Sequence, residues 1–309
     1  MAKRIAAGGP ARGHHGLRAA AWMGGALLAF SLMAIAVREL LDTMGTFEIL
    51  FFRSSISFLM VLAVLPRYGI GALRTKRIGL HATRNVLHFG GQAAWVYAIG
   101  VLPLATVFAI EFTMPVWTAV LATLVLGERL NHGRIVMLVL GLVGILIILR
   151  PGLAVVHPGA LATLAAAVCF ASVMVATKRL SATDSPLAVL FHMSVMQMPL
   201  GLATALPGWV APTVADLPWI LAVGGAGFGS HYCLTRAFML ADATFVVPLD
   251  FLRLPLIAVV GALFYGEPIE LVTLLGAAVI FAGIYYSLTR ERRGGVRGAV
   301  PPRSSERSP

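Results

Sequence analysis

The sequence predicts an all-α, polytopic membrane protein whose ten transmembrane helices form two inverted five-helix repeats. Three observations support this prediction. The 309 residues are 59% apolar and only 12% charged, whereas a soluble domain is nearer half apolar and a quarter charged. Apolar runs of the length that a bilayer requires, about 20 residues, follow one another along most of the chain. The second half of the chain also repeats features of the first half at a constant spacing.

Short connections separate the apolar runs, and several are a proline or glycine pair, such as Leu102-Pro103 and Pro151-Gly152. Helices joined so closely should be antiparallel neighbours. The helices are expected at 19–37, 46–66, 81–101, 103–126, 133–149, 158–177, 186–206, 217–240, 243–265 and 269–288.

The basic residues predict which helix ends face the cytoplasm. With the N-terminus inside, nineteen of the twenty-four lysines and arginines lie on the cytoplasmic side, and only Arg38 and Arg150 lie outside. This asymmetry is typical of multi-pass proteins and predicts two cytoplasmic termini, hence an even number of spans. It also accounts for the net charge of +11 without nucleic acid as a partner.

A spacing of 139 residues relates the two halves of the chain. Each half has five expected helices, and because five is odd the second half should be inserted upside down. Inverted repeats are typical of secondary transporters, whose substrate site lies between the repeats near the middle of the membrane. The spacing pairs Glu111 with Asp250, Gly127 with Gly266, Glu128 with Glu267, Gly144 with Gly283 and Arg53 with His192.

We therefore expect four parts in the chain. They are a cytoplasmic basic N-tail at 1–18, a first repeat at 19–149, a second repeat at 150–289, and a disordered basic C-tail at 290–309.

Glu111 and Asp250 lie inside two related apolar runs. A charge there is costly, so it should face the bundle interior and have a partner. Estimated depths predict an outer pair of Arg53 with Glu111 and an inner cluster of Arg236, Asp250 and Arg253. The alternative is that these groups are structural ion pairs that join helices without touching substrate.

The expected third helix carries polar side chains at three- and four-residue intervals, which places them on one face. Asn85, His88, Gln92 and Trp95 form this face, with Tyr97 above it. We expect it to line the cavity; hydrogen bonding between helices is the alternative. In the eighth helix, His231 is its counterpart.

Histidines can change charge near physiological pH. His88, His192 and His231, together with Glu111 and Asp250, are therefore candidates for a coupling proton or cation. The alternative is that each histidine is a hydrogen-bonded strut.

Pro115, Pro248 and Pro255 lie within the expected fourth and ninth helices, which they should kink because proline lacks a backbone N–H. The Gly-Glu pairs at 127–128 and 266–267 fall at the ends of these helices. We interpret them as structural helix ends.

Several motifs are missing from the sequence. It has no G-x-x-x-x-G-K-[ST] phosphate loop, no H-E-x-x-H zinc motif and no G-x-S-x-G nucleophile turn. We therefore expect no cofactor, no metal site and no enzyme activity. An intramembrane lipid-modifying enzyme, which would need a clustered catalytic pair, and a channel, which would need a continuous polar stripe, remain the alternatives from other classes.

The FFRSSISF segment at 51–58 and the paired GERL at 127–130 and GEPI at 266–269 carry a family likeness. With two five-helix repeats, the chain resembles the drug/metabolite transporter (DMT) superfamily, and within it the EamA-type transporters. The resemblance covers about residues 19–289. It implies a bacterial cytoplasmic (inner) membrane carrier of small metabolites, with a central cavity lined by both repeats. The second repeat departs from the pattern at GEPI and at His192.

From these features we expect a secondary active carrier that moves a small polar metabolite, such as an amino acid, by alternating access. Efflux is the expected direction. Both signs of charge near the centre suit a zwitterionic compound. The alternative is an uptake carrier for a vitamin or nucleotide-type metabolite. The carrier is expected as a monomer or homodimer in the lipid bilayer.

Overall fold

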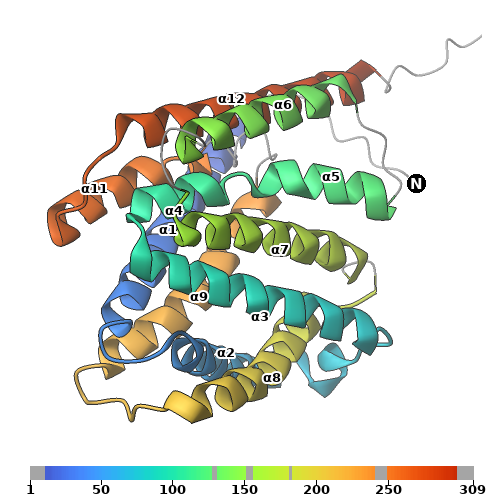
Figure 1. Cartoon of the computed structure of the whole chain (residues 1–309). Helices are drawn as coiled ribbons and strands as arrows, with labels where there is room; N and C mark the ends of the chain where they lie inside the picture. Colours follow the sequence, from blue (N-terminus) through green and yellow to red (C-terminus); the bar gives the residue numbers. More distant parts are fainter. Residues whose placement is uncertain (1–10, 127–130, 151–155, 181–182, 241–248, 298–309) are drawn as a thin grey trace, which may run out of the picture.

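The computed structural model describes residues 11–126, 131–150, 156–180, 183–240 and 249–297. Every regular element in these ranges is a helix, as the fold class predicted, and the helices lie side by side in one bundle (Figure 1). The elements are α1 (Ala11–Leu40), α2 (Thr46–Tyr68), η1 (Ile70–Leu73), α3 (Ile78–Val101), α4 (Leu104–Glu111), α5 (Met114–Leu126), α6 (His132–Leu149), α7 (Pro158–Leu180), α8 (Pro186–Ala205), η2 (Leu206–Gly208), α9 (Leu217–Leu240), α11 (Arg253–Tyr265) and α12 (Leu271–Arg297).

Seven helices in the described ranges are long and apolar enough to cross a membrane. The third helix of each expected repeat, α3 and α9, is not among them, although each has 24 residues. In α3 the polar face around Asn85 and Gln92 lowers the hydropathy. The count of ten spans therefore stays a prediction. The seven are Leu17–Leu40, Thr46–Tyr68, Leu104–Val125, His132–Leu149, Pro158–Leu180, Pro186–Gly208 and Leu271–Arg290.

The expected fourth helix is broken into α4 and α5 at Phe112 and Thr113. Pro115 explains the position of the break, because proline has no N–H to donate to the carbonyl of Glu111 four residues earlier. A second break, at 251–252, lies just before Pro255. A shift of 139 residues carries the first break onto the second, so the repeat extends to the backbone. Pro248 lies outside the described residues.

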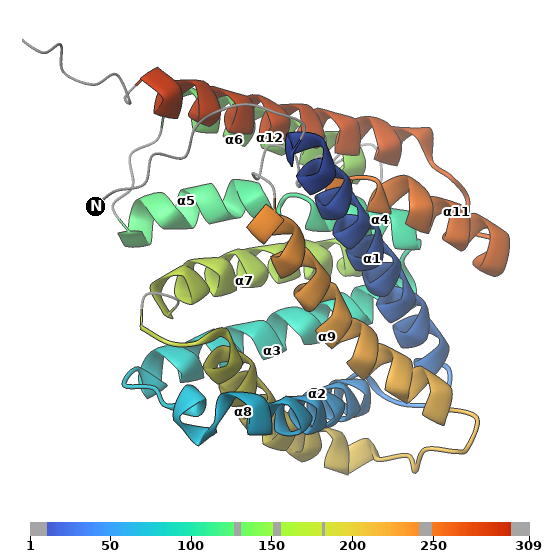
Figure 2. The same cartoon turned by 180° about the vertical axis from the view of Figure 1, so that it is seen from behind.

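The contacts between helices are related by the same symmetry as the two repeats. Each helix pair has an equivalent pair in which the two repeats have swapped roles. The first helix of one repeat packs against the third helix of the other, as α1 does with α9 and α3 with α7. Corresponding helices pack against each other, as α2 does with α8 and α6 with α12. Both views show α6 beside α12 at one edge and α2 beside α8 at the opposite edge (Figures 1 and 2). This is the contact pattern of two related halves around a shared axis.

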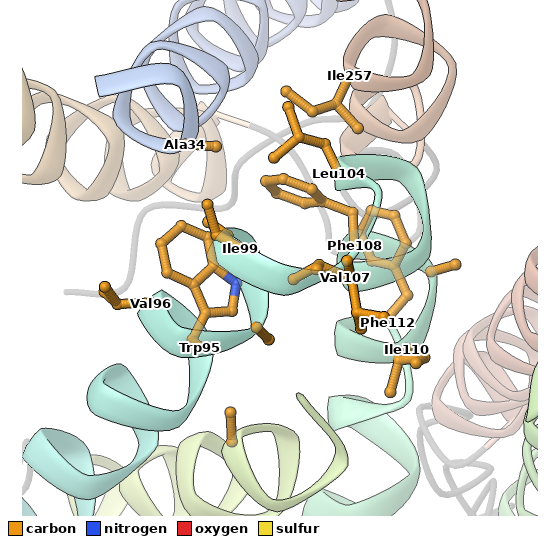
Figure 3. Packing of buried hydrophobic residues seen from close by; sticks show 14 of the residues in the cluster. Ala34, Trp95, Val96, Ile99, Leu104, Val107, Phe108, Ile110, Phe112 and Ile257 are labelled. Carbon is orange, nitrogen blue, oxygen red and sulfur yellow. The ribbon is translucent and has the colours of Figure 1, made fainter. Parts of the chain in front are cut away.

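The short helix α4 lies at the centre of the apolar core. From Leu104 to Ile110 its side chains are buried except that of Thr106, which is partly buried. Figure 3 shows Phe108 of α4 near Trp95 of α3 and Ile257 of α11. A helix that is buried on nearly all sides is an interior element. The break after α4 therefore lies inside the protein and not at the lipid surface.

Close packing of α6 against α12 depends on Gly144. A β-carbon there would lie 2.4 Å from Ile280 Cγ1 and 2.6 Å from the carbonyl oxygen of Gly276. We expect Gly144→Ala to lower the free energy of unfolding by about 1–3 kcal/mol, measured as thermal unfolding in detergent. Gly24→Ala is the matched control, because a β-carbon at Gly24 meets nothing within 4 Å. Equal losses in the two variants would contradict this packing.

Candidate functional site

A buried polar network joins α2, α3 and α8. These three helices contact one another and lie in the lower part of the bundle in Figure 2. The Arg53 guanidinium of α2 donates a hydrogen bond to Gln92 Oε1 of α3. Gln92 Nε2 donates to His88 Nδ1 at 2.8 Å and to Gln197 Oε1 of α8 at 3.1 Å. Gln197 Nε2 in turn donates to His88 Nδ1 at 3.0 Å and to the carbonyl of Asn85 at 3.3 Å. The predicted polar face of the third helix is thus directed into the protein.

The network continues along α3 to Arg84. Arg84 Nη1 donates to Asn85 Oδ1 at 2.8 Å, and its Nε donates to Thr177 Oγ1 of α7 at 2.8 Å. Asn85 Nδ2 donates to the carbonyl oxygen of His192 at 3.1 Å. Asn85, His88 and Gln92 therefore each have a structural partner as well as a place in the polar core.

Arg53 is a buried cation bonded by a neutral amide. Its side chain is 9% exposed, and no carboxylate of the described residues lies within ion-pair distance. Beside it is a cavity of about 10 Å³, lined by Ser57, Ser194 and Gly227 among others. That volume holds about one water molecule. The environment of Arg53 favours an anion, but a metabolite would need the helices to move apart.

A second charged centre lies where the two helix breaks meet. The Phe112 and Phe251 rings stack with centroids 4.2 Å apart. Arg253 Nη2 lies 3.6 Å from Glu111 Oε1 and 3.3 Å from Asp250 Oδ2. The predicted proximity of Asp250 and Arg253 is therefore present, and Glu111 of the first repeat joins them.

Two carboxylates and one guanidinium make up this centre. With all three groups charged it carries one excess negative charge, and a charge buried in a membrane requires compensation. Trp95 Nε1 donates to Glu111 Oε2 at 2.8 Å and holds that carboxylate on the side of α3. An added positive charge at this centre would offset the excess negative charge.

The two centres are connected through α3. Gln92, which binds Arg53, and Trp95, which binds Glu111, are three residues apart. Side chains at that spacing are neighbours on one face of a helix. A buried positive charge and an excess negative charge thus lie next to successive turns of the same helix face.

Some expected contacts are not formed. Arg53 does not pair with Glu111, because α3 lies between them and supplies a partner to each. Arg236 does not join the Asp250 cluster; its guanidinium carbon lies 5.5 Å from the ring centroid of Trp22. Tyr97 is 44% exposed and so lies away from the polar face.

His192 stacks on His81 with ring centroids 4.5 Å apart, and its Nδ1 lies 2.8 Å from the carbonyl oxygen of Ala188. The side chain of His231 lies outside the described residues. Gln197 was missed, although a buried amide within the apolar run 186–206 was a signal that could have identified it.

Glu267, which follows the end of α11, also contacts residues of the first repeat. Its Oε1 lies 2.8 Å from Arg38 Nη2, and its Oε2 accepts the backbone N–H of Leu104 at 2.7 Å. A carboxylate at the first residue of α4 is favoured by the helix dipole. Gly266 has φ +62°, as expected for a glycine that ends a helix. Glu267 thus joins the second repeat to the first; its counterpart Glu128 lies outside the described residues.

A buried pair of a histidine and an aspartate lies near the N-terminal end of α3. His81 is fully buried, and its Nε2 lies 2.8 Å from Asp184 Oδ2 in the connection between α7 and α8. Burial alone would raise the pKa of Asp184, but hydrogen bonds from Thr75, His81 and Thr183 outweigh it and hold that pKa at about 2. This pair again joins the two repeats.

These features define a multi-pass helical membrane protein with two related halves around a buried charged centre. A model of the EamA-like transporter family matches residues 17–150 and again residues 157–289. The chain belongs to the EamA-like transporter family. It is therefore a transporter and not an enzyme, as the sequence predicted.

Three relatives illustrate what such proteins carry. A riboflavin transporter of Rhizobium johnstonii is 32% identical over 278 residues, covering 89% of this chain and 92% of the relative. An S-adenosylmethionine uptake transporter of Rickettsia prowazekii is 27% identical, covering 88% and 92%. A pseudopaline exporter of Pseudomonas aeruginosa is 27% identical, covering 87% and 95%.

A solved crystal structure shares the fold. It superimposes with a TM-score of 0.62 at 18% identity, covering 89% of this chain and 98% of the other. At that identity the likeness concerns the fold alone.

Asp184 offers a test of the pair near the end of α3. Because its pKa is lower in the folded state than its ordinary 3.8, the carboxylate stabilises the fold above that pH. The contribution is lost as the pH falls towards about 2. We expect Asp184→Asn to lower the free energy of unfolding at pH 7 by about 1–3 kcal/mol, with a difference that shrinks below about pH 4.

Thermal unfolding in detergent between pH 3 and 7 would measure this difference. Glu270→Gln is the control, because Glu270 pairs with Arg150 in an exposed position, where ion pairs contribute about 0–1 kcal/mol. A loss for Asp184→Asn no larger than that of the control would contradict the assignment.

Proposed function

We propose that this protein is a secondary active carrier for a small zwitterionic metabolite in the bacterial cytoplasmic membrane. The observation that supports it is the placement of opposite, incompletely compensated charges beside successive turns of α3. Arg53 would bind the anionic group of the substrate, and Glu111 with Asp250 would balance its cationic group. The positive-inside asymmetry of the sequence supports cytoplasmic termini.

Transport would proceed by alternating access. The space beside Arg53 holds about one water molecule, so substrate entry requires the repeats to separate on one side. The two helix breaks meet at the centre and supply places where the backbone can bend. Contacts between the repeats, such as Arg38–Glu267 and His81–Asp184, would have to break and re-form during the cycle.

The substrate class and direction rest on different support. An amino acid or a related compound carries both signs of charge and so fits the site. Efflux remains our proposed direction, and one relative is named as an exporter. Uptake of a vitamin or nucleotide-type metabolite is the second candidate, since the riboflavin relative is 32% identical. A coupling proton would be accommodated by the excess negative charge of the Glu111 centre.

A metabolite comparison would test the proposal. Cells that lack, contain or overproduce the protein would be compared by mass spectrometry of intracellular and external metabolites. Efflux predicts a zwitterion that accumulates inside when the protein is missing and outside when it is overproduced. A neutral or purely anionic substrate would contradict the proposed class, and the opposite gradient would contradict the direction.

Glu111→Gln should reduce transport of that compound at least about tenfold, because the variant removes the excess negative charge and the proton-accepting group. Glu270→Gln, which neutralises an exposed carboxylate, is the matched control and should transport normally. Transport would be measured in proteoliposomes with equal amounts of folded protein. Wild-type rates in Glu111→Gln would remove this carboxylate from the mechanism.

Alternating access can be tested by thiol labelling. In a background in which Cys169 and Cys233 are replaced by alanine, a cysteine would be placed at Gln92 or, with less disturbance, at Ser57 beside Arg53. A membrane-impermeant reagent should reach the thiol from the outside under one substrate gradient and from the inside under the reverse. Access from one side under all conditions would contradict alternation.

A further inference from the structure

The guanidinium of Arg253 lies in a cage of aromatic rings. Its central carbon is 4.6 Å from the ring centroid of Phe30, 4.9 Å from that of Phe108 and 5.1 Å from that of Phe112. A cation within about 6 Å of a ring face is attracted by the ring electrons. The rings come from α1, α4 and the first helix break, whereas Arg253 begins α11. We call the three rings, together with the space between them that the guanidinium occupies, the aromatic cage.

Hydrogen bonding contributes little to holding Arg253 there. Its contacts to Asp250 and Glu111 are 3.3 and 3.6 Å long, whereas charge-assisted hydrogen bonds are about 2.7–2.9 Å. Arg253 Nε and Asp250 Oδ1 are both buried without a hydrogen-bond partner in the described structure. The cage therefore holds a cation through ring faces and nearby negative charge, and the Nε–H of that cation has no hydrogen-bond acceptor in the described structure.

Arg253 is also the asymmetric member of the centre. The shift of 139 residues that relates Glu111 to Asp250 places Met114 at the position of Arg253. All three rings of the cage belong to the first repeat, whereas the cation that lies among them is carried on the second. A site built this way would remain attractive to a cation if the arginine withdrew.

We propose that the aromatic cage binds the cationic group of the substrate, and that Arg253 is a tethered occupant which the substrate displaces. This inference rests on the proposed function and specifies its substrate class. The favoured ligand is an onium cation, a sulfonium or quaternary ammonium, since such groups lack N–H donors and are recognised by ring faces. A carboxylate on the same molecule would bind at Arg53.

Equilibrium binding to the purified full chain in detergent tests the proposal with two probes. S-adenosylmethionine carries a sulfonium and S-adenosylhomocysteine is the uncharged thioether, so their affinity ratio isolates the onium charge. We expect the wild type to prefer the sulfonium roughly tenfold, and Phe112→Leu or Phe108→Leu to reduce this preference to less than about threefold. Phe58→Leu, a control ring that contacts Phe191, should keep the wild-type ratio. An unchanged ratio in the Phe112 and Phe108 variants would overturn the proposal.

Arg253→Met gives the second test, because it installs the residue of the first repeat and removes the tethered cation from the cage. We expect it to bind S-adenosylmethionine at least about tenfold more tightly than the wild type. Arg150→Met, which removes an exposed arginine, should leave affinity unchanged. Weaker binding by folded Arg253→Met would show that Arg253 is a direct ligand and overturn the displacement.

The outcomes separate this inference from the proposed function. Glycine betaine, a quaternary ammonium zwitterion, serves as a smaller probe of the same class. If folded Arg253→Met binds neither probe, the cage does not take onium cations and the inference fails. The metabolite comparison could still identify a zwitterion with a primary ammonium group, and the proposed function would then stand.

Discussion

The cost of burying charge in an apolar membrane is the constraint on which this structure depends. Arg53, Glu111, Asp250 and Arg253 are placed at the centre of the bundle, where water cannot solvate them freely. The fold compensates each charge only in part, through Gln92, Trp95 and one guanidinium shared by two carboxylates. In the mechanism that we propose, this incomplete compensation makes the centre receptive to a charged ligand.

The charged centre lies where the two repeats meet. The helix breaks meet face to face, and both polar centres are bonded to α3, which also packs against the other repeat through α7. Arg38–Glu267 and His81–Asp184 join the repeats at positions away from the centre. A change in the charge of the centre would therefore alter contacts of both repeats at once.

Hydropathy, basic residues and the spacing of 139 predicted the helical fold, the repeats and the approximate positions of both breaks, because these depend on patterns within one segment. They could not predict which helix faces which. Depth along a helix placed Arg53 level with Glu111, but only packing shows that α3 separates them. Three other features depend on packing between helices and were not predicted for the same reason. They are the role of Gln197, the position of Arg236 near Trp22 and the contact of Glu267 with α4.

Cross-linking of Phe112→Cys with Phe251→Cys tests the central claim most directly, since these side chains belong to the two breaks and lie in contact. The experiment would use intact membranes and a short thiol cross-linker, with both native cysteines replaced. A Gly25→Cys variant that retains Cys233 is the positive control, because Cys233 Sγ lies 3.2 Å from the β-carbon position of Gly25. The account predicts efficient linking of 112 to 251 and loss of transport on linking. A pair that stays unlinked while the control links would contradict it.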